Sequence, residues 1–137
     1  MNKSLAQNVS VLLGRLAYSN PDFISRYLDF FLKQFCISLK FTKECPEKSQ
    51  AFEYFYFYLI IFRGLCRAII KNPNGVINHF AFLCDAICNY IDAPDELEEL
   101  FHNLIFSFKT SLKDKWSEYF SLFPEKLRKK MTTRFAV

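Results

Sequence analysis

The sequence predicts an all-α chain of antiparallel helical hairpins stacked as an α-solenoid, and an internal repeat is the main reason. Asn20-Pro21 and Asn72-Pro73 each separate two stretches of helical apolar periodicity, and a shift of 52 residues superimposes them and places Arg15 on Arg67. Seven apolar positions then coincide: Ile24, Leu28, Phe31, Leu32, Phe35, Cys36 and Leu39 with Val76, Phe80, Leu83, Cys84, Ile87, Cys88 and Ile91. Hairpins that repeat in this way bury their apolar faces against their neighbours, which is typical of a solenoid.

A second observation is that no segment alternates convincingly as a strand. Residues 52–58 are rich in β-formers, but helical periodicity continues on both sides of them, so they are predicted to be helical.

The first helix is predicted from one apolar stripe and ends at the first proline corner. Residues 5, 9, 12, 13 and 16 are Leu or Val and follow the spacing of one helix face. Asn20 ends this helix, because a residue before proline is pushed out of the α region, whereas Pro21 suits the first turn of the next helix. That second helix is predicted over residues 21–39.

The remaining helices follow from the next stop and start signals. A third helix is predicted from Pro46 to Lys71, and a fourth over residues 76–91. Acidic residues from Asp95 onward favour the start of a fifth helix, which runs to Leu112. A corner near residues 113–115, a short helix around Trp116 and a last helix from Pro124 complete the prediction.

Length and composition indicate one soluble globular domain over residues 1–137. The chain is 51% hydrophobic with 17 Phe and 7 Tyr, and 23% charged, which is neither disordered nor membrane-like. Its longest apolar run, residues 54–62, is far shorter than the ~20 residues of a membrane span. Residues 1–7 lack the apolar core of a secretory leader, so the five cysteines are predicted to be reduced core residues of an intracellular protein.

The sequence predicts no catalytic, cofactor or metal site. No nucleophile elbow, phosphate-binding glycine loop or paired-carboxylate motif occurs, so an enzyme is not expected. His79, Cys84, Cys88 and His102 are the candidate zinc ligands. His79 does not share the helix face of Cys84 and Cys88, however, and both cysteines align with core positions of the first hairpin. Core packing is the preferred interpretation.

Two exposed features leave an alternative open. A basic cluster near the end of the chain is interpreted as a solvated helix face, with a nucleic-acid patch as the alternative; it comprises Lys126, Arg128, Lys129, Lys130 and Arg134. The sole tryptophan, Trp116, is interpreted as closing the end of a core, with a partner hot spot as the alternative.

Several motifs together resemble the C-terminal end of the transportins, a group within the karyopherin-β family. They are Asn8 followed by Gly14-Arg15-Leu16, then Asn72-Pro73-Asn74-Gly75-Val76, Cys84-Asp85-Ala86, and Phe123-Pro124 close to Val137. The resemblance covers residues 5–137 and implies two to three HEAT repeats.

By resemblance, the whole receptor imports proteins that bear proline-tyrosine nuclear localisation signals. It binds cargo on the concave face of its C-terminal half and Ran-GTP mainly through N-terminal repeats. Nucleoporins are further candidate partners, nucleic acid and membrane are not expected, and the implied location is cytoplasm and nucleus. The final repeats chiefly pack the end of the spiral, so no residue here is assigned a cargo or Ran contact. The rivals are another HEAT or armadillo interaction scaffold and a basic helical nucleic-acid-binding domain.

One departure from the family pattern concerns residues 53–62. In the family the equivalents of Ala51-Phe52 and Arg63-Gly64 are adjacent, so these ten residues resemble an insertion, either a genuine lengthening or translated intron sequence. Removing them would reduce the repeat offset from 52 to 42 residues, within the ~40–47 of HEAT repeats. Some of the aromatic side chains in the segment are expected to be exposed.

Overall fold

The computed structural model describes residues 3–41, 48–90 and 93–137, which form helices and turns without a strand. The predicted all-α class is confirmed. The elements in order are α1 (Lys3–Ser19), α2 (Pro21–Ser25), α3 (Leu28–Phe41), α4 (Lys48–Lys71), the 3-10 turn η1 (Pro73–Gly75), α5 (Phe80–Cys88), α6 (Asp95–Leu112), the 3-10 turn η2 (Lys113–Lys115), α7 (Trp116–Ser121) and α8 (Glu125–Phe135).

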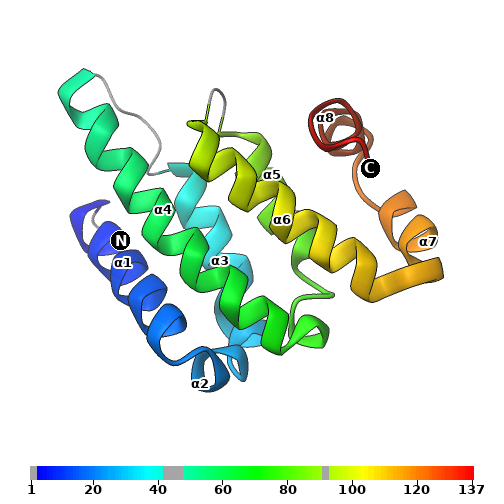
Figure 1. Ribbon diagram of the computed structural model, residues 1–137, viewed down its shortest axis with the longest axis horizontal. Helices are drawn as coiled ribbons and strands as arrows, with labels where there is room; N and C mark the ends of the chain where they lie inside the picture. Colours follow the sequence, from blue (N-terminus) through cyan, green and yellow to red (C-terminus); the bar gives the residue numbers. More distant parts are fainter. Residues whose placement is uncertain (1–2, 42–47, 91–92) are drawn as a thin grey trace.

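The long helices form two layers in sequence order. In one layer α1 packs on α4 and α4 packs on α6, so that the three helices lie side by side (Figure 1). In the other layer α3 packs on α5 and α5 packs on α8. Each hairpin therefore places one helix in each layer and contacts the next hairpin along the chain, which is the arrangement of an α-solenoid.

The proline corners end α1 and α4 where the sequence predicted. The helices predicted to follow each corner are interrupted or begin later than expected. The predicted helix over residues 21–39 is divided between α2 and α3, because Tyr27 N–H bonds to the Ile24 carbonyl three residues back, at 3.0 Å, and the Ser25 hydroxyl donates to the Asp22 carbonyl at 2.9 Å. The predicted helix over residues 76–91 begins only at Phe80, after a turn in which His79 N–H bonds to the Val76 carbonyl at 2.8 Å. Residue 91 lies outside the described residues.

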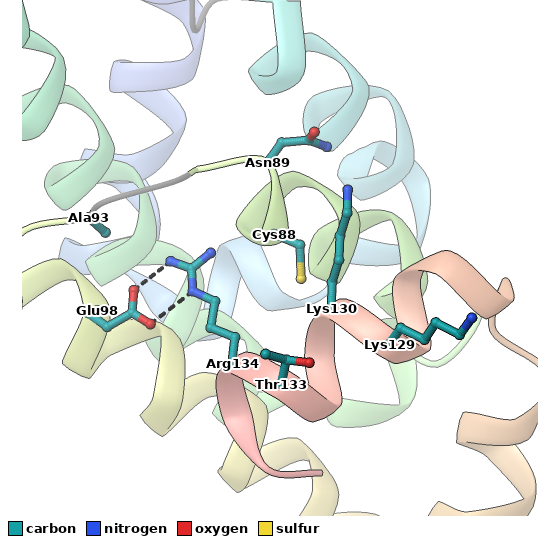
Figure 2. A pocket seen from close by; sticks show the side chains of 8 residues that line it. All are labelled: Cys88, Asn89, Ala93, Glu98, Lys129, Lys130, Thr133 and Arg134. Atoms are coloured by element: carbon teal, nitrogen blue, oxygen red, sulfur yellow. Dashed lines mark hydrogen bonds and ion pairs between the residues drawn. The ribbon is translucent and has the colours of Figure 1, made fainter.

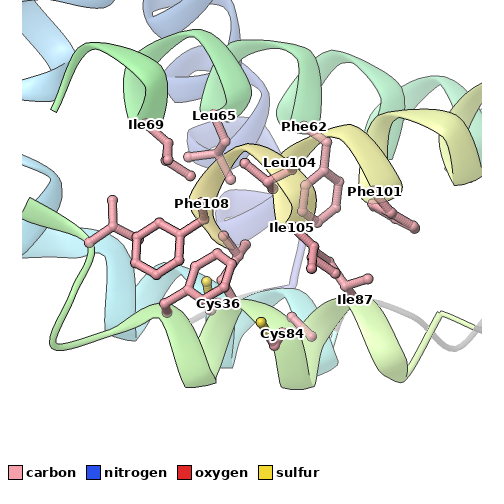
Figure 3. Close-up of a cluster of buried hydrophobic side chains, with 14 of the residues drawn as sticks. Cys36, Phe62, Leu65, Ile69, Cys84, Ile87, Phe101, Leu104, Ile105 and Phe108 are labelled. Atoms are coloured by element: carbon pink, nitrogen blue, oxygen red, sulfur yellow. The ribbon is translucent and has the colours of Figure 1, made fainter. Parts of the chain in front are cut away.

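Aromatic rings pack against one another both within a layer and between the two layers. Phe62 of α4 meets Phe101 of α6 edge-on, with 4.8 Å between ring centroids (Figure 3). Phe80 of α5 stacks on Phe108 of α6, with 3.8 Å between ring centroids. Trp116 is 6% exposed and stacks on Phe120 at 5.2 Å, which agrees with its interpretation as a residue that closes the end of the core.

The cysteines of the described residues are free thiols, and three of them are buried. Cys36, Cys84 and Cys88 lie in the core, and Cys66 is half-buried between α4 and α6. The fifth, Cys45, lies outside the described residues. Burial agrees with the interpretation of the cysteines as small core residues.

Residues 53–62 lie within α4, and Tyr58 and Phe62 are the buried aromatic side chains among those that the structure describes in this segment. The expectation that some of the aromatic side chains are exposed stays a prediction, because those of residues 54–57 lie outside the described side chains. Tyr58 is 3% exposed and its hydroxyl donates to the Leu39 carbonyl at 2.9 Å. Phe62, 1% exposed, packs on α6, and Ile61 lies against α1. Because α4 is packed between α1 and α6, the positions of Tyr58, Ile61 and Phe62 lie in the core. Whether the segment is an insertion stays a prediction.

Candidate interaction surfaces

The contact between α1 and α4 is built on two glycines inside helices. A Cβ placed on Gly64 would lie 2.0 Å from the Gly14 carbonyl oxygen, and a Cβ on Gly14 would lie 2.8 Å from the Ile61 Cα. Mid-helix glycine costs about 1 kcal/mol relative to alanine. Here that cost is offset because the two helix backbones come into direct contact.

A hydrogen bond and a cation–π contact join the same two helices at the end of α1. The Arg67 guanidinium donates to the Tyr18 carbonyl at 2.8 Å, and its central carbon lies 4.5 Å from the Tyr18 ring centroid. Because Tyr18 is in the last turn of α1, its carbonyl has no partner within the helix, so Arg67 satisfies an acceptor that the helix leaves open. The alignment of Arg15 with Arg67 was the sequence signal for this contact, although its role could not be read from sequence.

The second Asn-Pro corner is joined to the first hairpin by one side chain. The Asn72 amide donates to the Ser25 carbonyl at 2.9 Å, and its oxygen accepts from Gly75 N–H at 3.2 Å. Lys71 and Asp22 also face each other at 3.6 Å, but both are largely exposed, so this pair contributes little. The repeated corner is therefore a joint between consecutive hairpins.

The other side of α1 exposes an apolar stripe. Val9, Leu12 and Leu16 are 40, 57 and 42% exposed. These three residues present apolar surface at the N-terminal end of the described helices. Apolar residues in one line along a helix are typical of an interface with another element.

At the other end of the solenoid, one arginine joins three helices. Arg134 of α8 forms a two-pronged ion pair with Glu98 of α6, with its Nε 2.9 Å from Oε1, and its Nη1 donates to the Ile87 carbonyl of α5 at 2.9 Å (Figure 2). The Arg134 hydrogen bonds hold the pKa of the Glu98 carboxyl below its usual value of 4.5. His102, 3.4 Å from Glu98, acts in the same direction.

The structure divides the basic cluster into structural and exposed members. Arg134 is engaged as above, Arg128 donates to the Phe123 carbonyl at 3.1 Å, and Lys129 lies 3.3 Å from Glu125. Lys126 and Lys130 are exposed and form no ion pair within the residues that the structure describes. Two arginines of the cluster therefore contribute to the packing of the fold, and its lysines face solvent.

The space between the helices includes two hollows of similar volume. One, of about 630 Å³, is bounded by Cys88, Lys130 and the Arg134–Glu98 pair (Figure 2). The other, of about 610 Å³, lies between α4 and α6 and is largely apolar, with Ile70 and Phe106 exposed at 63 and 67%.

The histidines and cysteines that are candidate metal ligands make other contacts in the structure. His79 Nε2 is 2.8 Å from Asp29 Oδ1, and His102 faces Glu98. Over residues 3–41, 48–90 and 93–137, no group of three or more His, Cys, Asp or Glu side chains is arranged to hold a metal ion. Burial raises the pKa of the Cys66 thiol to about 12 and that of Cys84 well above its usual value, so these thiols are poor nucleophiles. Among the helices described, none combines the length and apolar character needed to cross a bilayer.

Comparison with known proteins finds relatives along nearly the whole chain. Transportin-1 of Mus musculus is 32% identical over 136 residues, or 98% of the chain, and transportin of Dictyostelium discoideum is 30% identical over 135 residues. Importin subunit beta-2 of Schizosaccharomyces pombe is 24% identical over 104 residues. The chain spans only 10–14% of the length of these relatives. No family model matches the chain.

Proposed function

Because this chain is homologous to a segment of the transportins, we propose that it forms the C-terminal HEAT-repeat part of a transportin-like nuclear import receptor. The observation that carries the proposal is the match over 98% of the chain, which runs through all of the stacked hairpins rather than through one motif. The helical layers are the architecture expected of HEAT repeats.

The two ends of the solenoid support a C-terminal position. Terminal repeats need a polar outer face, since no further repeat covers them. α8 buries Leu127, Met131 and Phe135 and exposes most of its polar positions, including Lys126 and Lys130. The stripe on α1 is apolar instead, as at a position inside a longer array.

In the proposed mechanism, the full-length receptor binds proteins with proline-tyrosine nuclear localisation signals in the cytoplasm and releases them in the nucleus when Ran-GTP engages its N-terminal repeats. The part described here closes the end of the spiral and keeps the preceding repeats in register. We assign no cargo or Ran contact to any of its residues. Its role is that of a binding scaffold rather than an enzyme, and nucleoporins are candidate partners of the same receptor.

A chimera tests this proposal. Mouse Transportin-1 in which the matched stretch is replaced by this chain should carry a reporter with a proline-tyrosine signal into nuclei of permeabilised cells and release it on addition of Ran-GTP. The control is Transportin-1 with the stretch deleted. A chimera that is soluble and helical but imports no better than the deletion control would refute the proposal.

A basic helical nucleic-acid-binding domain is the second candidate, and the exposed Lys126 and Lys130 are the observation in its favour. Nonspecific phosphate contacts weaken steeply with salt, and with Arg128 and Arg134 engaged in the fold few cations remain. We expect no binding of duplex or single-stranded DNA or RNA at physiological salt, measured by fluorescence anisotropy. Salt-resistant binding that Lys126→Ala and Lys130→Ala abolish would favour this candidate.

A third candidate is another HEAT or armadillo interaction scaffold. In that case the chimera with mouse Transportin-1 would be unable to bind the reporter.

A further inference from the structure

A small hollow lies in the groove between α1 and α4, and arginines from both helices line it. Its volume is about 270 Å³, and its lining consists of Arg15 and Tyr18 of α1 with Ile60 and Arg63 of α4. The two helices lie side by side along this groove (Figure 1). Both walls belong to hairpins of this chain, so the hollow is complete without any further repeat.

The glycine contact between the helices brings the two arginines to one place. Arg15 directly follows Gly14, and Arg63 directly precedes Gly64, which meets the Gly14 backbone. Guanidinium groups keep their charge at any physiological pH. Like charges on the two walls of one hollow repel each other, and an anion bound between them turns that repulsion into attraction.

The charge around the hollow is not balanced within the described part of the chain. Arg63 forms an ion pair with Glu96 of α6, but both side chains are about half exposed, so the pair contributes little. Arg67 stacks on the Tyr18 ring and gives its hydrogen bond to a neutral acceptor, the Tyr18 carbonyl. The Arg15 side chain makes no hydrogen bond or ion pair with the residues that the structure describes. Three guanidinium groups thus meet one carboxylate, which leaves two positive charges in excess.

The sequence around the hollow keeps this excess in place. α1 contains no acidic residue, and the single acidic residue of α4, Glu53, stands ten residues before Arg63, or about 15 Å along the helix axis. Further along α4, Lys71 is offset by Asp22 at 3.6 Å. The unbalanced charge is therefore concentrated at the hollow.

We propose that this hollow, lined by Arg15, Tyr18, Ile60 and Arg63, binds a phosphate monoester carried on a side chain of a partner protein. A phosphorylated side chain carries about −1.5 to −2 charges at pH 7, which matches the excess of two positive charges. Guanidinium groups from the two walls can each donate two hydrogen bonds to phosphate oxygens. A carboxylate has a single charge and two oxygens, so it would leave one arginine without compensation.

The form of the hollow favours one phosphorylated side chain over a nucleic acid or a membrane. A nucleic acid presents a row of phosphates and a membrane presents a sheet of headgroups, so both favour cations that are spread along a surface. Here the arginines converge on one small hollow, as in sites that recognise phosphorylated peptides. Ile60 and the Tyr18 ring supply apolar lining for the carbon stem of the residue. The site requires neither cargo nor Ran-GTP, so the import chimera and the following test can fail separately.

The test titrates the full chain with capped phosphoserine and capped phosphotyrosine at constant ionic strength. Binding is followed by NMR through the Nε–Hε resonances of the arginines, and capped aspartate and sulfate are the comparison ligands. We expect at least one of the phosphorylated probes to bind several-fold more tightly than either comparison ligand and to shift the resonances of Arg15 and Arg63. Absence of binding by both phosphorylated probes, or affinity no greater than that for sulfate, would overturn the proposal.

Substitutions connect the binding to the hollow. Arg15→Gln and Arg63→Gln should each weaken binding of the phosphorylated probe several-fold, whereas Lys126→Gln, at an exposed position of α8, should leave it unchanged. Arg15→Lys keeps the charge but not the fork of donors and should recover only part of the loss. Equal weakening by Lys126→Gln would overturn the proposal, because the probe would then respond to net charge alone. Sedimentation with phosphatidylcholine vesicles that contain phosphatidylinositol bisphosphate, if Arg15→Gln abolishes it while the phosphorylated probes do not bind, would replace the proposed partner with a membrane.

Discussion

Gly14 and Gly64 lie where the solenoid tolerates the least change. Alanine is the better helix former by about 1 kcal/mol, so propensity alone predicts that Gly64→Ala stabilises the chain. The added Cβ would meet backbone at 2.0 Å, however, and backbone can give way only if α1 moves as a whole. Overpacking of this kind costs about 1–3 kcal/mol, and here it exceeds the gain in propensity.

We therefore expect Gly64→Ala to lower the free energy of unfolding by about 1–2 kcal/mol in urea denaturation. Thr110→Ala, at an exposed position of α6, is the matched control and should be neutral or slightly stabilising. Stabilisation by Gly64→Ala would mean that α1 and α4 are farther apart in solution than the structure places them.

Arg134 is the residue whose role differs most from its sequence context. It stands in a run of exposed cations, yet its partners Glu98 and Ile87 lie 36 and 47 residues away. No local pattern identifies such partners, because they are selected by the packing of α8 against α5 and α6. The sequence could predict a basic helix face, but not that Arg134 is the residue of that face that packs against α5 and α6.

Removal of the guanidinium should be costly and dependent on pH. Hydrogen bonds to charged groups contribute about 1.5–3 kcal/mol, so Arg134→Ala should destabilise the chain by about 2–3 kcal/mol at pH 7. Arg134→Lys keeps the charge but not the two-pronged geometry and should recover only part of this loss.

The same ion pair should make stability depend on pH. The Glu98 pKa is lowered in the folded state, so the contribution of Glu98 to stability is complete above the ordinary pKa of 4.5 and is lost as pH falls through the lowered pKa. In urea unfolding from pH 7 to pH 3, the difference in free energy of unfolding between wild type and Arg134→Ala should shrink below about pH 4.5. A difference that stays constant over this range would show that the ion pair is not its source.

At the scale of elements, the corners were predictable and the first turns after them were not. The Asn-Pro corners end α1 and α4 as predicted, because proline restricts the backbone of the residue before it. The helix breaks after Ser25 and before Phe80 depend on backbone hydrogen bonds to the residue three positions earlier and on contacts with the neighbouring hairpin. Local helix propensity does not encode these interactions. The apolar stripe of α1 was predictable as one face of a helix, whereas the roles of Arg67 and Asn72 follow from their contacts with the preceding hairpin, which lie 49 and 47 residues away in the sequence.

The length of α4 bears on the predicted insertion at residues 53–62. α4 has 24 residues, whereas α3, the helix before it, has 14, and Figure 1 shows the first part of α4 extending past α1. At 1.5 Å per residue the excess is about 15 Å. Removal of ten residues would make α4 as long as α3 and would bring Phe52 to the position of Phe62 and Ala51 to that of Ile61. It would also bring Lys48 and Ser49 to the buried positions of Tyr58 and Leu59.

Deletion of residues 53–62 should therefore fold but with reduced stability, since each large-to-polar exchange in the core costs about 2–5 kcal/mol. The same deletion combined with Lys48→Tyr and Ser49→Leu restores the buried side chains and should recover most of the loss. Thermal unfolding followed by circular dichroism at 222 nm compares the two. If the repaired deletion also fails to fold, the segment is integral to the hairpin and the prediction of an insertion is wrong.

At the scale of the whole molecule, the main helix contacts among the described residues join consecutive hairpins. α1 packs on α4 at one end, and α8 packs on α5 at the other. In such an array stability is the sum of repeat and nearest-neighbour terms, and a change at one joint affects mainly the hairpins it joins. A domain with a single shared core would instead lose protection throughout.

Hydrogen exchange measured by mass spectrometry can separate these two behaviours in the full chain. Gly64→Ala should speed exchange in α1, α2 and α3 and leave α8 as protected as in the wild type, because the changed contact lies at the first joint. Arg134→Ala should do the reverse, loosening α8 and the adjoining end of α5 while α1 is unaffected. α4 and α5, which have a neighbour on each side within their layers, should exchange most slowly in all three proteins. Uniform acceleration by either substitution would show that the chain unfolds as one unit, and that its resemblance to a segment of a longer array does not extend to the way its stability is distributed.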